Sequence, residues 1–147
     1  MKKSHDRISG VSLDLSPMFK FQEALSPAVE RAIKNTLTQA RWTAKSLAHV
    51  DSGAMEAGTY TATHDQSDYD TAVAAAQAID PKVVILPEVQ QPGPGEGVLS
   101  NATEQSVFEE FGTVEHGPHP FMMPAAEEAS GAFITNLEDE IRKITPR

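Results

Sequence analysis

The sequence of 147 residues contains no cysteine, which excludes a disulfide framework and a thiolate metal site. It also lacks a long apolar run: the longest purely aliphatic stretch covers residues 83–86, whereas a membrane-spanning helix takes about 20 residues. Lys2, Lys3 and Arg7 look like the charged start of a signal peptide, but no apolar stretch follows them. A chain of this length fits one domain, and we expect residues 1–147 to form it without a membrane segment.

Basic residues are scarce in the middle of the chain. The formal net charge is −9, and residues 51–115 carry twelve acidic side chains against one basic side chain, Lys82. Residues 1–50 carry eight basic and four acidic side chains, and residues 116–147 carry three and five. Because phosphate binding depends on Lys and Arg, we expect no specific nucleic-acid binding. The charge separation is typical either of a solvated acidic face or of a basic surface that meets the acidic surface of a neighbouring copy.

A long amphipathic helix is predicted in the first third of the chain. It begins at Ser26 and Pro27, with serine at the N-cap and proline at the first helical position, and it ends near Ala48. Its apolar stripe comprises Val29, Ile33, Leu37, Ala40, Ala44 and Leu47. Ahead of it, residues 1–16 predict an N-terminal arm or edge strand, and residues 17–25 predict two helical turns.

The rest of the chain is predicted to hold a small sheet and two further helices. Residue patterns divide the middle into successive elements: strand 55–63, helix 67–79, buried strand 83–89, flexible loop 90–97, a strand within 98–111 and a turn at 117–120. A last helix over residues 124–144 has Phe133, Leu137, Ile141 and Ile144 on one face. The expected fold class is α+β: an antiparallel sheet covered by two long helices, with a short extra helix in the middle region.

Residues that could carry chemistry are present, but their spacing indicates no site. His116 and His119 are separated by glycine and proline, so no regular element aligns them as metal ligands. The glycines of residues 93–97 lie among prolines and lead into a strand, unlike a phosphate-binding loop that opens a helix. Residues 101–103 (N-A-T) match a glycosylation acceptor by chance. We therefore predict no catalytic residue, no cofactor and no metal.

Three short motifs follow one another along the chain. V-D-S-G (residues 50–53) ends the first long helix, E-F-G-T (residues 110–113) is expected to end a strand, and P-F-M-M-P-A (residues 120–125) starts the last helix. Their key residues are Asp51, Gly53, Glu110, Phe111, Gly112, Thr113, Pro120, Phe121 and Pro124. Glycine permits a close backbone approach, and phenylalanine between two prolines suits a buried plug beside a helix start. In order and spacing, the motifs resemble the tail-completion and neck family of long-tailed bacteriophages.

The resemblance implies a structural, non-catalytic virion protein of the neck or tail that is assembled in the host cytoplasm. Members of this family look like subunits of sixfold rings, so the implied partners are further copies of the chain and the neighbouring connector, stopper and tail proteins. DNA would pass through the lumen of such a ring. A tail terminator that caps the tail tube is an alternative within the same class. A small cytoplasmic enzyme or ligand-binding domain is an alternative from another class.

The polar side of the first long helix is a candidate subunit interface. This side carries basic residues and the single tryptophan of the chain: Arg31, Lys34, Arg41, Trp42 and Lys45. In a ring, it could meet the acidic middle region of a neighbouring copy. Trp42 falls off the main apolar stripe, so it either packs under residues 17–25 or anchors the interface.

Overall fold

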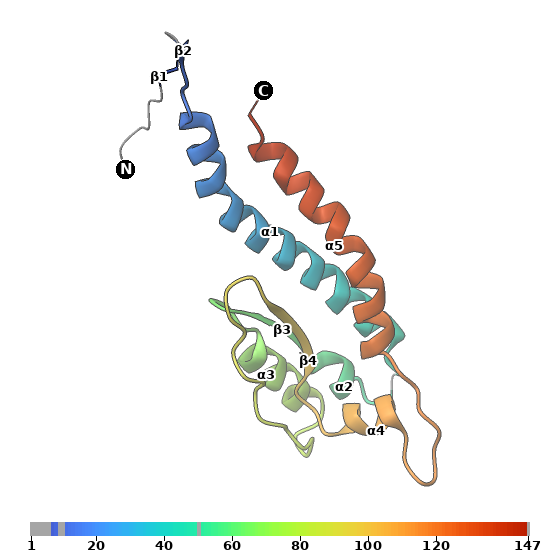
Figure 1. Cartoon of the computed structure of the whole chain (residues 1–147). Helices are drawn as coiled ribbons and strands as arrows, with labels where there is room; N and C mark the ends of the chain where they lie inside the picture. The colour runs from blue at the N-terminus through green and yellow to red at the C-terminus, as the bar shows by residue number, and fades with distance from the viewer. Residues whose placement is uncertain (1–6, 9–10, 50, 147) are drawn as a thin grey trace.

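The computed structural model describes residues 7–8, 11–49 and 51–146, which form an α+β fold (Figure 1). Its two long helices, α1 (Ser16–Leu47) and α5 (Met122–Ile144), run antiparallel and pack along one another. Both follow the apolar spacing of three and four residues that predicted them. The predicted fold class is confirmed, and α5 begins two residues earlier than expected.

A two-stranded antiparallel sheet of β3 (Thr59–Thr63) and β4 (Gly97–Asn101) lies between α1 and the shorter helix α3 (Tyr69–Ile79) (Figure 1). The two strands pair along their full lengths. Helix α1 approaches the sheet closely at Gly97, where an added Cβ would lie 2.8 Å from the Ile33 side chain. The close packing of the sheet on α1 therefore depends on glycine at this position.

Helix α1 passes through Pro27 without a break, although the sequence predicted that the helix begins there. Proline has no N–H for the carbonyl of Glu23, which a regular helix would bond at this position. Ser26 and Pro27 are both exposed, so water can reach this part of the backbone. The predicted segments 17–25 and 26–48 therefore form one helix of 32 residues.

The N-terminal segment does not join the main sheet. The sequence left an arm or an edge strand open for residues 1–16, and the described part forms a separate hairpin. Its two short strands, β1 (Arg7–Ile8) and β2 (Val11–Ser12), pair with each other. The Asp14 carboxylate then accepts hydrogen bonds from the N–H and the hydroxyl of Ser16, at 2.9 and 2.6 Å, where α1 begins. Of the two alternatives for residues 1–16, an edge strand of the main sheet is therefore wrong for the part that the structure describes.

The chain turns at Gly53 and enters α2 (Ala54–Ala57), a short helix that the sequence did not predict. Gly53 has a φ of 91°, a left-handed conformation that favours glycine. The strand predicted over residues 55–63 therefore begins only at Thr59, after α2. Alanine and methionine favour a helix over a strand, and the turn of α2 buries Met55.

Residues 83–89 are extended, but they do not form the buried strand that their sequence predicted. One isolated bridge joins Ile85 to Thr103, just past the end of β4. The pairing goes no further, because the N–H of Ala102 already donates to the carbonyl of Gly58 at 2.9 Å. Val84 is exposed, which shows that the aliphatic run covers the surface of the sheet region instead of crossing its centre.

Residues 98–111 contain the predicted strand within β4 and also an unpredicted helix, α4 (Gln105–Phe111). The E-F-G-T motif therefore ends a helix, and the expectation that it ends a strand is wrong. Ahead of β4, the predicted loop of residues 90–97 has no regular structure up to its last residue. It is held to α1 by a hydrogen bond of 2.7 Å from the N–H of Gly95 to the carboxylate of Glu30.

The core is built mainly from alanine. Among the described residues, twelve of the sixteen buried apolar side chains are alanines, and the long helices contribute half of those twelve. Tyr60 and Phe121 are the largest fully buried side chains. The fold therefore buries little side-chain volume for its length, and each large buried side chain carries a large share of the packing.

Replacing Pro27 by alanine should raise the free energy of unfolding by about 1–3 kcal/mol, because alanine restores a backbone donor inside α1. Pro17→Ala is the matched control. Pro17 occupies the first turn of the same helix, where the N–H has no partner within the helix, so a small effect is expected. Urea unfolding followed by circular dichroism measures both. A helix that begins at Pro27 would instead make Pro27→Ala neutral or destabilising.

Candidate functional site

The second and third motifs meet at the N-terminus of α5. The carboxylate of Glu110, near the end of α4, accepts three hydrogen bonds from backbone N–H groups. The donors are Phe121 at 3.0 Å, Met122 at 2.8 Å and Met123 at 3.1 Å. Pro124, the next residue, has no N–H, so Glu110 satisfies the free donors of this turn and places negative charge at the positive end of the helix. The contact closes a loop of eleven residues.

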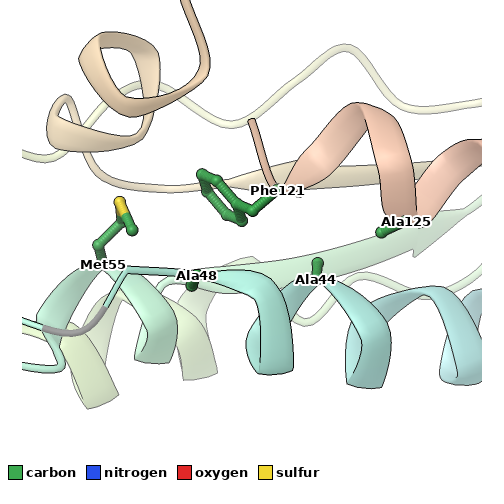
Figure 2. Close-up of a cluster of buried hydrophobic side chains, with 5 residues drawn as sticks. All are labelled: Ala44, Ala48, Met55, Phe121 and Ala125. Carbon is green, nitrogen blue, oxygen red and sulfur yellow. The ribbon is translucent and has the colours of Figure 1, made fainter. Parts of the chain in front are cut away.

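Phe121 fills the corner where α5 meets α1 and α2 (Figure 2). Its side chain is 0% exposed. The buried neighbours in this cluster are Ala44 of α1, Ala48 just after the last residue of α1, Met55 of α2 and Ala125 of α5. The prediction of a buried plug is confirmed. Leu99 and Met122, both partly buried, pack against this cluster, in which Phe121 is the largest fully buried side chain.

Gly112 ends α4 and turns the chain into the connector that leads to α5. Its φ is 77°, and an added Cβ would lie 2.8 Å from the backbone nitrogen of Pro118. Thr113 holds the turn that follows: its N–H donates to the carbonyl of His116 at 2.8 Å, and its hydroxyl accepts from the N–H of His116 at 3.0 Å. Both motif residues therefore shape the backbone.

Asp51 of the first motif lies at a polar cleft of about 290 Å³ between the end of α1 and the connector. His49, Glu109, His116 and His119 also line this cleft, and the rings of His49 and His119 stack with centroids 6.1 Å apart. In the part of the chain that the structure describes, no group of three or more His, Asp or Glu side chains could hold a metal ion. The cleft brings the first two motifs together without an arrangement suited to metal chemistry.

Three of the cations expected at a subunit interface form ion pairs within the chain. The pairs are Arg31–Glu140 at 2.8 Å, Lys34–Asp65 at 3.4 Å and Arg41–Asp68 at 3.3 Å. They connect α1 to α5 and to the segment between β3 and α3. The basic helix therefore meets acidic side chains of its own chain, and a neighbouring copy would have to compete with these contacts.

The pKa shifts of two of these carboxylates agree with the pairing. A hydrogen bond from Arg31 lowers the pKa of the buried Glu140 below its ordinary value. A hydrogen bond from Thr63, with a further contribution from Lys34, lowers the pKa of Asp65. Both carboxylates stay charged at neutral pH in the folded chain. The pair at Asp65 is exposed, and exposed pairs stabilise a fold only weakly.

Trp42 is 73% exposed on α1, so the prediction that it packs under residues 17–25 is wrong. It borders a groove between α1 and α5 whose floor includes Ala129 and Ala132. Lys45 lies in the last turn of α1, where a cation interacts favourably with the negative end of the helix dipole. The role of Trp42 as an interface anchor stays a prediction.

Helix α4 and the connector expose four large apolar side chains, which we call the α4 surface. Val107, Phe108, Phe111 and Val114 are 42, 50, 75 and 107% exposed. Val107 and Phe108 are adjacent, and Phe111 follows them by four and three positions, so the three share one face of α4. Sequence reasoning missed this surface because it took the segment for a strand. The helical spacing was the signal that could have found it.

A second apolar surface lies at the other end of the molecule, where the first turns of α1 meet the C-terminal end of α5 (Figure 1). It is a groove of about 520 Å³, which we call the end groove. Its apolar lining comprises Leu15, Pro17, Met18, Phe19, Phe21, Leu25 and Pro146. Exposed large apolar side chains that gather in patches, unlike scattered single ones, indicate interaction surfaces.

Asn101 belongs to a buried hydrogen-bond network, although its N-A-T sequence matches a glycosylation acceptor. Its side-chain amide donates to the carbonyl of Met55 at 2.7 Å and to the hydroxyl of Thr59 at 3.1 Å. Its side-chain oxygen accepts hydrogen bonds from the backbone N–H of Thr103 at 2.9 Å and from the hydroxyl of Thr103 at 2.7 Å. The residue therefore joins the end of β4 to α2 and β3, and the sequence match has a structural explanation.

Comparison of the chain with models of protein families, with curated proteins and with solved structures finds no match. Among the described helices, none is both long and apolar enough to cross a membrane. The family resemblance of the three motifs therefore stays a prediction. Function has to be argued from the contacts and surfaces of the chain itself.

Glu110→Ala should lower the free energy of unfolding by about 0.5–2 kcal/mol, the range for loss of a helix cap. Glu110→Gln should have a smaller effect, because the amide oxygen can still accept from the N-terminus of α5. The control is Glu115→Ala, which removes an exposed acid from the same connector. Thermal and urea unfolding measure all three variants. Equal stability of Glu110→Ala and Glu115→Ala would rule out the cap.

Phe121→Ala should destabilise the fold by about 3–5 kcal/mol, because it leaves a cavity where the fully buried phenyl ring was. Phe111→Ala removes the same atoms ten positions earlier from an exposed site, and we expect it to change stability by about 0.5 kcal/mol or less. Chemical unfolding of the two variants side by side tests this. Similar losses in both would mean that burial does not distinguish the two rings.

Proposed function

We propose that the chain is a structural, non-catalytic subunit of the neck or tail of a long-tailed bacteriophage. In this proposal, copies of the chain form a sixfold ring that completes the tail and joins it to the head, next to connector, stopper and tail proteins. The ring is assembled in the host cytoplasm and becomes part of the virion.

The distribution of large apolar side chains carries the proposal. The described part of the chain buries mostly alanine, while Trp42, Phe108 and Phe111 are at least half exposed. Burial of apolar area is the main favourable term in most protein association, at roughly 25 cal/mol per Å². A chain that leaves its bulky side chains outside its own core, in patches at two ends, is suited to association with further subunits.

The residues that carry the family resemblance support a structural role. Glu110 caps α5, Phe121 fills the corner beside it, and Gly112 shapes the connector between them. Each of these residues acts by holding elements of the fold together. The resemblance therefore rests on a unit that fixes the last helix, as a ring subunit needs for a stable contact surface.

The acidic surface fits a ring through which DNA passes. The chain has a formal net charge of −9, and its basic side chains at Arg31, Lys34 and Arg41 are paired within the fold. Like charge repels the phosphate backbone, so the duplex would move through the lumen without binding to it. A ring of this charge needs no specific nucleic-acid contact.

Inactivating the gene for this chain in its phage tests the proposal. We expect DNA-filled heads and tails of normal length that do not join, because the ring between them is missing. Purified protein added to a mixture of such extracts should restore infectious, joined particles, and the same mixture without protein is the control. Electron microscopy and plaque counts are the measurements.

Two other results would be informative. Tails of abnormal length would assign the chain to the alternative, a terminator that caps the growing tail tube. Joined and infectious particles without the chain would contradict a role in either place.

A further inference from the structure

Glu30 of α1 contacts both ends of the segment that connects β3 to β4. This segment leaves β3 at His64, contains α3 and returns to β4 through the loop of residues 90–97 (Figure 1). One carboxylate oxygen of Glu30, Oε1, accepts the hydrogen bond of 2.7 Å from the N–H of Gly95. The other oxygen, Oε2, lies 3.3 Å from Nδ1 of His64. A single side chain therefore connects α1 to the start and to the end of the segment.

The contact between Glu30 and His64 is shielded from water, but it is not a hydrogen bond. Oε2 of Glu30 and Nδ1 of His64 are both buried, and neither atom has a hydrogen-bond partner among the described residues. Buried polar atoms without a partner cost free energy. A neutral imidazole leaves both atoms unsatisfied, whereas a protonated imidazole forms an ion pair with the carboxylate. The charge of His64 therefore decides whether this contact is favourable.

The other charges near His64 also favour a cation at this position. A carboxylate oxygen of Asp65, the next residue, lies 4.0 Å from Nδ1. Lys34 of α1 is the basic side chain beside them, and it already pairs with Asp65. The loop of residues 90–97 contributes one charged residue, Glu96, whose carboxylate accepts a hydrogen bond from a backbone N–H of the loop itself. Two carboxylates, those of Glu30 and Asp65, thus face Nδ1, and the nearby lysine is paired.

The attachment of the loop depends on the same two residues. The side-chain amide of Gln91 donates a hydrogen bond to the backbone carbonyl of His64, and the N–H of Gly95 donates to Glu30. The other hydrogen bonds that residues 90–96 make with described residues are internal to the loop. Loss of the contact between Glu30 and His64 would therefore loosen the loop at its attachment to α1.

We propose that His64 and Glu30 form a pH-sensitive latch that holds the loop of residues 90–97 against α1. Protonated His64 pairs with Oε2 and keeps the carboxylate turned towards Gly95. Loss of the proton to water removes this attraction, so the carboxylate turns to solvent and releases the N–H of Gly95. An imidazole carries a positive charge below about pH 6.5, so the loop is held at mildly acidic pH and loosened above neutral pH. The latch does not depend on the proposed ring, because all of its groups belong to one chain.

Hydrogen exchange of the Gly95 amide, measured by NMR and corrected for the intrinsic pH dependence of exchange, tests the latch. The wild type should protect this amide roughly two- to fivefold more at about pH 5.5 than at about pH 8, the factor that corresponds to one partly exposed ion pair. Equal protection at the two pH values would overturn the inference, as would greater protection at the higher pH.

Two substitutions fix the charge at position 64 and keep the backbone carbonyl that Gln91 bonds. His64→Gln is neutral at both pH values, so the Gly95 amide should have the low protection at both. His64→Lys stays positive throughout this range, so the amide should have the high protection at both. A His64→Gln variant that keeps the pH dependence of the wild type would overturn the inference. So would a His64→Lys variant that is as weakly protected as His64→Gln, because a positive charge would then not hold the loop.

Glu30→Gln and His119→Gln separate the latch from other effects of pH. The amide oxygen of Glu30→Gln can still accept from Gly95 but carries no charge, so the pH dependence of protection should disappear. His119→Gln removes an exposed histidine of the connector, far from Glu30, and should keep the pH dependence of the wild type. Far-UV circular dichroism at both pH values checks that each variant is folded. A pH dependence that survives in Glu30→Gln or is lost in His119→Gln would contradict the latch.

Discussion

Close packing of α1 on α5 through alanine determines what the rest of the chain can bury. The two helices contribute Ala28, Ala32, Ala40, Ala44, Ala125 and Ala129 to the core. Small side chains let helix axes approach closely, but they leave no space for bulky residues between them. The apolar side chains of larger volume are therefore displaced to the margins of the helix pair. This explains how one chain can be well packed and still expose patches of phenylalanine, methionine and tryptophan.

The corner at the start of α5 converts this helix pairing into a defined tertiary arrangement. Contacts between alanines alone do not fix how far α5 is shifted along α1, because successive alanines present the same small side chain. Phe121 is the large side chain that fixes the register, since it fits only where α1 and α2 leave room. Glu110 fixes the same end from the other direction by capping the first turn of α5. A contact between residues eleven positions apart thereby sets the position of a helix of 23 residues.

Sequence reasoning predicted the elements whose signal is periodic and missed those that depend on context. The long helices follow from apolar spacing, and α3 follows from its alanine-rich body with acids in the first turn. Pro27 instead indicates a helix start, because nothing in the sequence shows that water reaches the backbone there. The aliphatic run of residues 83–89 predicts a strand, and only the fold shows that the N–H of Ala102, which would extend the pairing, already donates to Gly58. The motifs single out Glu110 and Phe121, but they place E-F-G-T at the end of a strand, whereas it ends α4. The partners of Glu110 lie across a loop, and no spacing rule predicts such a contact.

The basic first third and the acidic middle of the sequence do attract one another, but they form ion pairs within one chain, whereas the simplest expectation was a contact between copies. Opposite charges pair first with the nearest available partner, and for Arg31 and Arg41 that partner lies in the same chain. Such pairs have no entropy of association to overcome, so a second copy gains little by replacing them. The same holds at the C-terminal end of α5, where Arg142 pairs with Asp139 and Lys143 with Glu140, each at 3.2 Å. The exposed apolar side chains of the α4 surface and the end groove are therefore better suited than charge to hold a neighbour.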